Sequence, residues 1–141
     1  MEFENIQSFD LTTCIGSKVM RISRITAKIF RKYLRPFNIT GSQLTVLFIL
    51  AKREGLTQKR LCEIAQLEKS SLNRNLKRLF EKRYLSRKEF PIINITDEGK
   101  SLVNTIIPEW EKAMKEIRQI LGEDGEDALD MTLTKLMTKK A

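Results

Sequence analysis

The fold is decided by residues 56–83, which read LTQKRLCEIAQLEKSSLNRNLKRLFEKR. Thr57 is a favourable N-cap for a short helix over about residues 58–65, and residues 66–68 can form a tight turn. A second helix follows over about residues 69–83, and its apolar side chains share one face: Leu72, Leu76, Leu79 and Phe80. Two short helices joined by a tight turn are the outline of a helix-turn-helix.

The opposite face of this second helix is polar and basic. In a major groove its N-terminal half would meet base edges, which hydroxyl, amide and guanidinium groups can recognise. The later Lys77 and Arg78 suit phosphates, which add affinity but little sequence information. A basic helix face taken alone is more often simply solvated, but its position after a tight turn and before a hairpin favours a nucleic-acid interface. The predicted DNA-binding residues are Gln58, Ser70, Ser71, Asn73, Arg74, Lys77, Arg78, Arg87 and Lys88.

Further elements are predicted on both sides of this segment. Residues 84–89 and 92–96 form two short strands around Phe90 and Pro91, which together make a small β-hairpin, or wing. The predicted fold class is therefore mainly α with a small β-wing. The remaining predicted helices span residues 11–34, 41–53, 96–121 and 126–138.

The helices over residues 11–34 and 96–121 each carry apolar residues in a heptad pattern. Such a pattern is typical of helices that bury a seam against other helices. Five basic side chains cluster on the side of the first helix opposite its seam, where we expect a solvated face: Arg21, Arg24, Lys28, Arg31 and Arg35. The first seam consists of Ile15, Val19, Ile22, Thr26, Ile29 and Tyr33, and the second of Val103, Ile106, Trp110, Ala113, Ile117 and Ile120.

The composition of the 141-residue chain excludes several classes of protein. The chain contains no histidine and two cysteines, so it cannot build a histidine-based catalytic triad or most zinc sites. No nucleophile, base or metal ligand accompanies the acidic residues near 123–127, so the sequence predicts no enzyme, no metal site and no cofactor. Cys62 is expected in the core, and Cys14 is expected to pack at the edge of the apolar stripe of its helix.

The charge pattern favours a polyanionic partner. The formal net charge is +8 and the sequence pI is about 9.7, and nucleic acid is the commonest partner of such a basic surface. Basic residues concentrate in residues 11–35 and 59–88, whereas residues 109–130 carry a net negative charge. The most apolar run, residues 44–51, is far shorter than the ~20 residues of a membrane helix. The chain starts without a signal-peptide pattern, so the expected location is the cytoplasm.

The sequence resembles the MarR family of winged helix-turn-helix transcriptional regulators. The resemblance rests on the order of the predicted elements and on residues 56–61, 67–74, 76–85 and 95–100. It implies an obligate homodimer in which the terminal helices of two chains pack together, so that two helix-turn-helix lobes read an inverted repeat in duplex DNA. It also implies repression of transcription, controlled by a small aromatic effector that binds between the dimer region and the lobe.

The resemblance divides the chain into three segments of one discontinuous domain. Residues 1–38 would form the N-terminal dimerisation helix, residues 39–100 the winged helix-turn-helix lobe, and residues 101–141 the C-terminal dimerisation helices. The two heptad seams suit such a dimer independently. The predicted dimerisation residues are Ile15, Val19, Ile22, Ile106, Trp110, Ala113, Ile117, Ile120, Leu133 and Leu136.

The wing departs from the family pattern. It is short and contains no Asp-x-Arg motif, whose arginine reaches the minor groove in the family, so Arg87 and Lys88 remain as phosphate contacts at its base. This departure motivates one alternative, a protein–protein interaction module with weakened DNA binding. A winged-helix RNA binder is a second alternative. A third alternative is a redox-sensing regulator that acts through the Cys14 thiol, because some family members sense hydroperoxides with a cysteine near this position.

Overall fold

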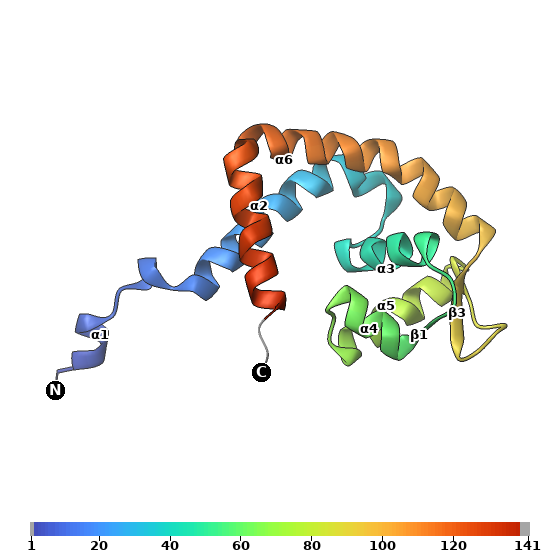
Figure 1. Cartoon of the computed structure of the whole chain (residues 1–141), viewed down its shortest axis with the longest axis horizontal. Coiled ribbons are helices and arrows are strands. Elements are labelled where there is room, and N and C mark those ends of the chain that lie inside the picture. Colours follow the sequence, from blue (N-terminus) through green and yellow to red (C-terminus); the bar gives the residue numbers. More distant parts are fainter. Residues whose placement is uncertain (1, 139–141) are drawn as a thin grey trace.

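The structure is a computed structural model that describes residues 2–138, in which two long helices extend from a small lobe (Figure 1). Residue 1 and residues 139–141, which belong to the predicted terminal segments, lie outside the described residues. The mainly α fold class with a small β-wing is confirmed. The helices are α1 (Glu4–Ser8), α2 (Ile15–Leu34), α3 (Gly41–Lys52), α4 (Gln58–Ala65), α5 (Lys69–Glu81) and α6 (Asp97–Met137), with 3₁₀ turns η1 (Leu11–Thr13) and η2 (Arg35–Phe37).

The lobe is built from α3, α4, α5 and a three-stranded antiparallel sheet. The strands β1 (Leu56–Thr57), β2 (Leu85–Ser86) and β3 (Ile92–Ile95) are arranged in the order β1-β3-β2, with Leu56 opposite Ile93 and Leu85 opposite Ile95. The strand β1 was not predicted, because two residues are too few to show an alternating pattern. The side chains that α3, α4 and α5 bury completely are Val46, Leu47, Leu61, Leu72 and Leu79.

Threonine caps set the helix starts of the lobe. Thr40 and Gln43 form a reciprocal capping box at the start of α3, each side chain accepting a hydrogen bond of 3.2 Å from the backbone N–H of the other residue. The Oγ1 of Thr57 accepts from the N–H of Arg60 at 3.3 Å, and that of Thr96 accepts from Gly99 at 3.0 Å. These contacts confirm the predicted starts of α3, α4 and α6, since each cap is local in sequence.

Two predicted helix boundaries were wrong. The helix expected over residues 11–34 begins at Ile15, because the Asp10 side chain caps the separate turn η1 and leaves Cys14 in an extended backbone conformation. The helix expected over residues 69–83 ends at Glu81, because Arg83 adopts a left-handed backbone with φ of 64°.

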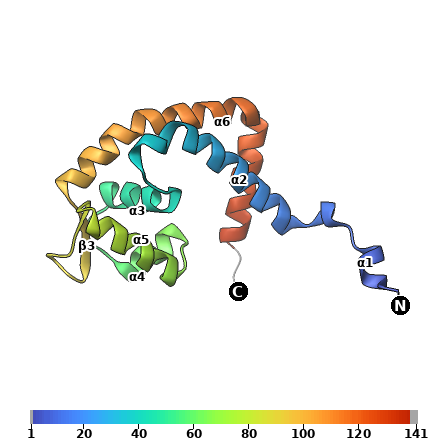
Figure 2. The ribbon, with the colours of Figure 1, turned by 180° about the vertical axis from the view of Figure 1, so that it is seen from behind.

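The helix α6 turns a sharp corner at Gly122, which separates its two halves (Figures 1 and 2). Gly122 has φ of 70° and ψ of 177°, a conformation that residues with a side chain rarely adopt. The prediction of two helices is therefore confirmed, although the expected turn over residues 122–125 is reduced to this single glycine. The predicted second helix accordingly begins a few residues earlier than residue 126.

The first half of α6 packs along α2 (Figures 1 and 2). Across this contact the Tyr33 hydroxyl donates a 2.8 Å hydrogen bond to Oε1 of Glu116, and the Lys32 ammonium pairs with the same oxygen. The hydrogen bond from Lys32, and after it the one from Tyr33, holds the pKa of the Glu116 carboxyl below its usual value. Within residues 2–138, no helix combines the length and the apolar character needed to cross a membrane.

Candidate nucleic-acid interface and adjacent cavity

The helix α5 presents the two faces that its sequence predicts. Leu72, Leu76 and Leu79 are buried against the lobe, and the polar side chains point away from it. The N-terminal residues of this outer face are free of the lobe core and so could reach the base edges of a major groove. Of the predicted residues on α5, Ser71 is half-buried and the others are exposed: Ser70, Asn73, Arg74, Lys77 and Arg78.

A side-chain pair connects the two helices of the helix-turn-helix. Gln58, at the start of α4, donates a hydrogen bond from Nε2 to Oδ1 of Asn73 on α5. Because this contact occupies the carbonyl oxygen of Asn73, the Asn73 amide group is left as a donor toward whatever faces α5. Donors from asparagine recognise acceptor atoms on base edges, such as N7 of a purine. The sequence predicts both residues as DNA-binding but does not predict their hydrogen bond, because a separation of 15 residues carries no local signal.

Arg74 is also positioned within α5. Its Nη2 donates to the hydroxyl of Ser71, one turn earlier, at 3.3 Å. This single contact leaves the other guanidinium N–H groups available, and two of them can bind guanine O6 and N7 at once. Arg74 is therefore the side chain on this face with the greatest capacity to discriminate between bases.

The wing places its two basic residues differently. The guanidinium carbon of Arg87 lies 3.9 Å from the centroid of the Phe80 ring, which fixes this cation against the C-terminal half of α5. Lys88 is exposed, and its backbone N–H donates to the Ser86 hydroxyl at 3.2 Å. Phe90 is 79% exposed, so the turn that joins the strands carries an apolar side chain instead of an arginine.

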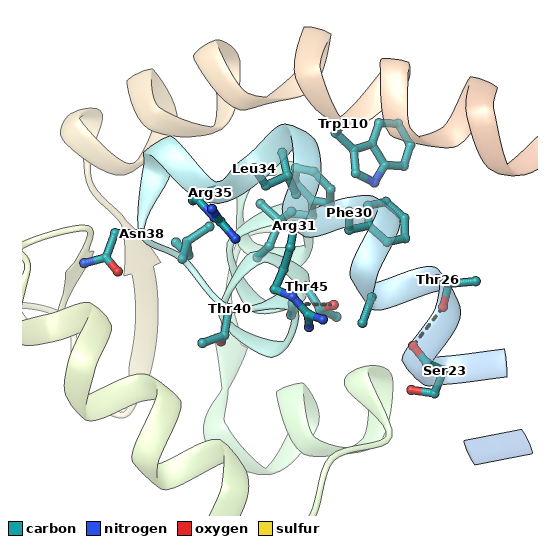
Figure 3. A pocket seen from close by; sticks show the side chains of 15 residues that line it. Ser23, Thr26, Phe30, Arg31, Leu34, Arg35, Asn38, Thr40, Thr45 and Trp110 are labelled. Atoms are coloured by element: carbon teal, nitrogen blue, oxygen red, sulfur yellow. Dashed lines mark hydrogen bonds between the residues drawn. The ribbon is translucent and has the colours of Figure 1, made fainter. Parts of the chain in front are cut away.

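A cavity of about 610 Å³ lies between α2, η2, α3 and α6 (Figure 3). Its apolar lining includes the rings of Phe48 and Trp110, which meet edge to face with centroids 5.5 Å apart. Phe30, Leu34 and Leu44 extend this lining. A largely apolar cavity of this size is typical of a small-molecule site.

Positive charge lies at one side of the cavity. Arg31 of α2 and Arg35 of η2 line it, and Figure 3 shows both side chains projecting from this chain segment toward α3. Gly41, the first residue of α3, also lines the cavity, and a helix N-terminus carries a partial positive charge. The arrangement suits an apolar molecule that bears an anionic group. The heptad pattern of this helix predicts only a solvated face for both arginines, because a repeat on one helix does not reveal an opposing wall.

The predicted dimerisation residues fall into two groups. Six are exposed in the single chain: Ile15, Val19, Ile22, Ile120, Leu133 and Leu136. By contrast, Ile106 and Ala113 are 0% exposed, Ile117 is 8% exposed, and Trp110 packs against Phe48. These four side chains pack inside their own chain, and their assignment to a dimer contact stays a prediction. Heptad spacing shows that a face is buried but not which neighbour buries it.

The cysteines also differ from each other. Cys62 is half-buried against the lobe core, as predicted. Cys14 is exposed and is the N-cap of α2, where its Sγ accepts from the Ser17 N–H at 3.4 Å, so the prediction that it packs was wrong. Within residues 2–138, no three His, Cys, Asp or Glu side chains gather as a metal site would require.

The fold and the exposed basic face of α5 define a winged helix-turn-helix protein of the DNA-binding class. The MarR family model matches residues 37–91, which run from α3 to the turn that precedes β3. An uncharacterised helix-turn-helix transcriptional regulator of Bacillus cereus is 26% identical over 98 residues, covering 67% of each chain. The chain is therefore similar to the MarR family of transcriptional regulators over its helix-turn-helix region, and its fold matches that of solved MarR-family proteins.

Two solved structures illustrate the similarity of fold. The repressor CouR, solved bound to p-coumaroyl-CoA, superposes with a TM-score of 0.84 at 20% identity, covering 94% of this chain and 98% of CouR. The Mycobacterium tuberculosis protein Rv2887, solved in complex with DNA, gives a TM-score of 0.64 at 18% identity over 88% and 98% of the two chains. The similarity extends over nearly the whole chain and so includes the terminal helices.

Proposed function

We propose that this regulator is a cytoplasmic homodimer that binds an inverted repeat in duplex DNA and represses transcription by occluding a promoter. The observation that carries the proposal is the exposed, cationic outer face of α5, set on a buried leucine core and continued by Arg87 beside it. Rv2887, which shares the fold, has been solved with DNA bound. The many cations predict a steep dependence of affinity on salt, because each phosphate contact releases counterions.

The proposed dimer is supported by apolar side chains that the single chain leaves uncovered. Ile15 is 77% exposed and Leu136 is 67% exposed, and both lie on helices outside the lobe. Exposed apolar surface of this kind marks a surface for association. A second copy of the chain is the natural partner, because a two-fold dimer would cover both surfaces and present two α5 helices to one duplex.

The proposed effector site is the cavity under α2. It lies between α2 and α6, which lead to the proposed dimer contact, and α3, which belongs to the lobe. A ligand there would change DNA affinity only if it bound the DNA-competent and incompetent arrangements of the lobes differently. The aromatic lining suits an aromatic ligand, and CouR has been solved with the aromatic thioester p-coumaroyl-CoA.

The proposed function is tested by selecting bound fragments from the source genome and comparing two variants on the selected site. Arg74→Ala should reduce the preference for that site over random duplex by about 1–3 kcal/mol, because it removes a base contact. Lys77→Ala should instead weaken binding to both duplexes equally and reduce the salt dependence, because it removes a phosphate contact.

The outcome also separates the alternatives. A failure of the wild-type protein to bind any duplex at micromolar concentration and low salt would contradict the proposal and favour the protein-interaction module. Preference for a structured RNA over duplex DNA in a competition would favour the RNA binder. Equal losses on all DNA for Arg74→Ala would reassign this residue to phosphate contact.

A further inference from the structure

We propose that the cavity under α2 takes a ligand with an apolar aromatic head and a phosphate-bearing tail, and that the tail lies along the basic face of α2. The inference rests on the proposed function, since it specifies the chemistry of the effector. The head would occupy the space lined by Phe30, Phe48 and Trp110.

The basic face consists of one continuous stripe of cations. Successive members are three or four residues apart, which keeps them on one side of the helix over about 21 Å. All are exposed, and among residues 2–138 no carboxylate forms an ion pair with any of them. The members of the stripe are Arg21, Arg24, Lys28, Arg31 and Arg35.

The stripe and the cavity are joined at Arg31 and Arg35. Both residues belong to the stripe and both line the cavity, and Figure 3 shows them beside the aromatic lining. Lys28 and Arg24 follow Arg31 at the next two positions along the stripe. A tail that left the cavity past Arg31 would therefore meet further cations instead of apolar surface.

The number of cations argues for phosphates and against a single carboxylate. Five like charges that share one helix face repel one another, and one carboxylate can satisfy only one or two of them. A phosphate group brings a charge of about −1.5 to −2 at neutral pH and matches the forked geometry of arginine. A polyphosphorylated tail would neutralise the stripe, as no side chain of residues 2–138 does.

The proposed dimer would leave the stripe accessible. The exposed apolar residues Ile15, Val19 and Ile22 lie on the side of α2 opposite the stripe, at 3.6 residues per turn. Association through these residues would cover the apolar face and not the basic one. The lobe carries its own cations on α5, so the stripe is a second and separate anion-binding site.

The proposal is tested by isothermal titration of the full chain with matched probes. The probes are benzoyl-, phenylacetyl- and cinnamoyl-coenzyme A, the three free acids, and coenzyme A alone. At least one thioester should bind about ten-fold more tightly than both its free acid and coenzyme A. The variant Arg21→Gln/Arg24→Gln/Lys28→Gln should lose about ten-fold of that thioester affinity and keep its affinity for the free acid, since it removes only exposed charges outside the cavity.

A control variant carries the same change in net charge elsewhere. Lys52→Gln/Arg53→Gln/Lys100→Gln neutralises three exposed cations that lie outside the cavity and the stripe, and it should bind the thioester as the wild type does. Equal losses in both triple variants would show non-specific attraction and overturn the proposal. Binding of no thioester, or equal binding of thioester and free acid, would also overturn it.

Operator binding is measured on the same variants without ligand. If the stripe variant loses DNA affinity while its thioester affinity is unchanged, the stripe is a DNA contact and the proposal is wrong. If the wild-type protein binds a thioester as expected but binds no DNA, the proposed function fails while the inference about the ligand stands. The two failures are therefore distinguishable.

Discussion

The lobe and the terminal helices differ in how far their apolar side chains are buried within one chain. In the lobe, α3, α4 and α5 bury Leu47, Leu61 and Leu79 completely within one chain. On the outer parts of α2 and α6, residues of the same kind remain in contact with solvent, such as Ile22 at 48% exposure and Leu133 at 55%. The difference shows that the lobe buries its apolar core within one chain, and it supports the proposal that a second copy covers the apolar surface of the terminal helices.

The largest effect is expected from a variant that disrupts the proposed association of the terminal helices. In Ile22→Asp a two-fold contact would bury two unpaired carboxylates, so the dissociation constant of the dimer should rise about 1000-fold, or about 4 kcal/mol. Sedimentation equilibrium measures this constant, and far-ultraviolet circular dichroism should show that the helices persist. The control variant Asn104→Asp adds the same charge at an exposed polar position of α6 and should change neither the dissociation constant nor the circular dichroism. An unchanged dimer in Ile22→Asp would show that α2 does not form the contact.

The second prediction compares a leucine-to-alanine substitution in the lobe with the same substitution in the terminal helices. Leu79→Ala leaves a cavity in the lobe core and should lower the free energy of unfolding by about 3 kcal/mol at every protein concentration. Leu133→Ala should instead weaken association, so its cost in urea unfolding should disappear once the protein is diluted below the dissociation constant. Equal and concentration-independent losses in both variants would contradict the distinction between the regions.

A smaller effect concerns specificity within the lobe. Gln58→Ala should reduce discrimination at the base that Asn73 contacts by about 1 kcal/mol, because the Asn73 amide loses the hydrogen bond that orients it. Binding of base-substituted operators, measured by fluorescence anisotropy, gives this quantity. In an Asn73→Ala background the effect of Gln58→Ala should vanish, and additive losses would show that Gln58 acts independently.

The smallest effect concerns the contact between α2 and α6. Because the folded pKa of Glu116 lies below its usual value, the stabilisation from this ionised carboxylate is present above the usual carboxyl range and is lost as pH falls through the folded pKa. Glu116→Gln should therefore unfold at a lower urea concentration than the wild type at pH 7, and the two midpoints should converge as the pH falls below the usual carboxyl range. A constant difference across this range would exclude ionisation of Glu116 as the cause.

Local signals in the sequence were sufficient for much of the lobe. Thr40, Thr57 and Thr96 mark helix starts because a cap and its N–H donor lie within three residues of each other. The outer face of α5 follows from helical periodicity alone, since the buried leucines fix the opposite side.

Contacts between distant segments could not be predicted in this way. The pair of Gln58 and Asn73 and the cavity beside Arg31 exist only because the fold brings separate helices together. The second heptad seam shows the same limit: Ile106 packs within its chain and Ile120 does not, although the spacing treats them alike. Which partner buries a periodic face depends on the path of the chain, and that path includes the corner at Gly122.

Dimerisation is tested most directly by the molar mass of the protein in dilute solution, measured by light scattering during size-exclusion chromatography. If the exposed apolar faces of α2 and α6 join two copies, the mass at micromolar concentration should be twice the 16.4 kDa of one chain. A mass of one chain at that concentration, with DNA bound at one protomer per site, would contradict the proposed dimer.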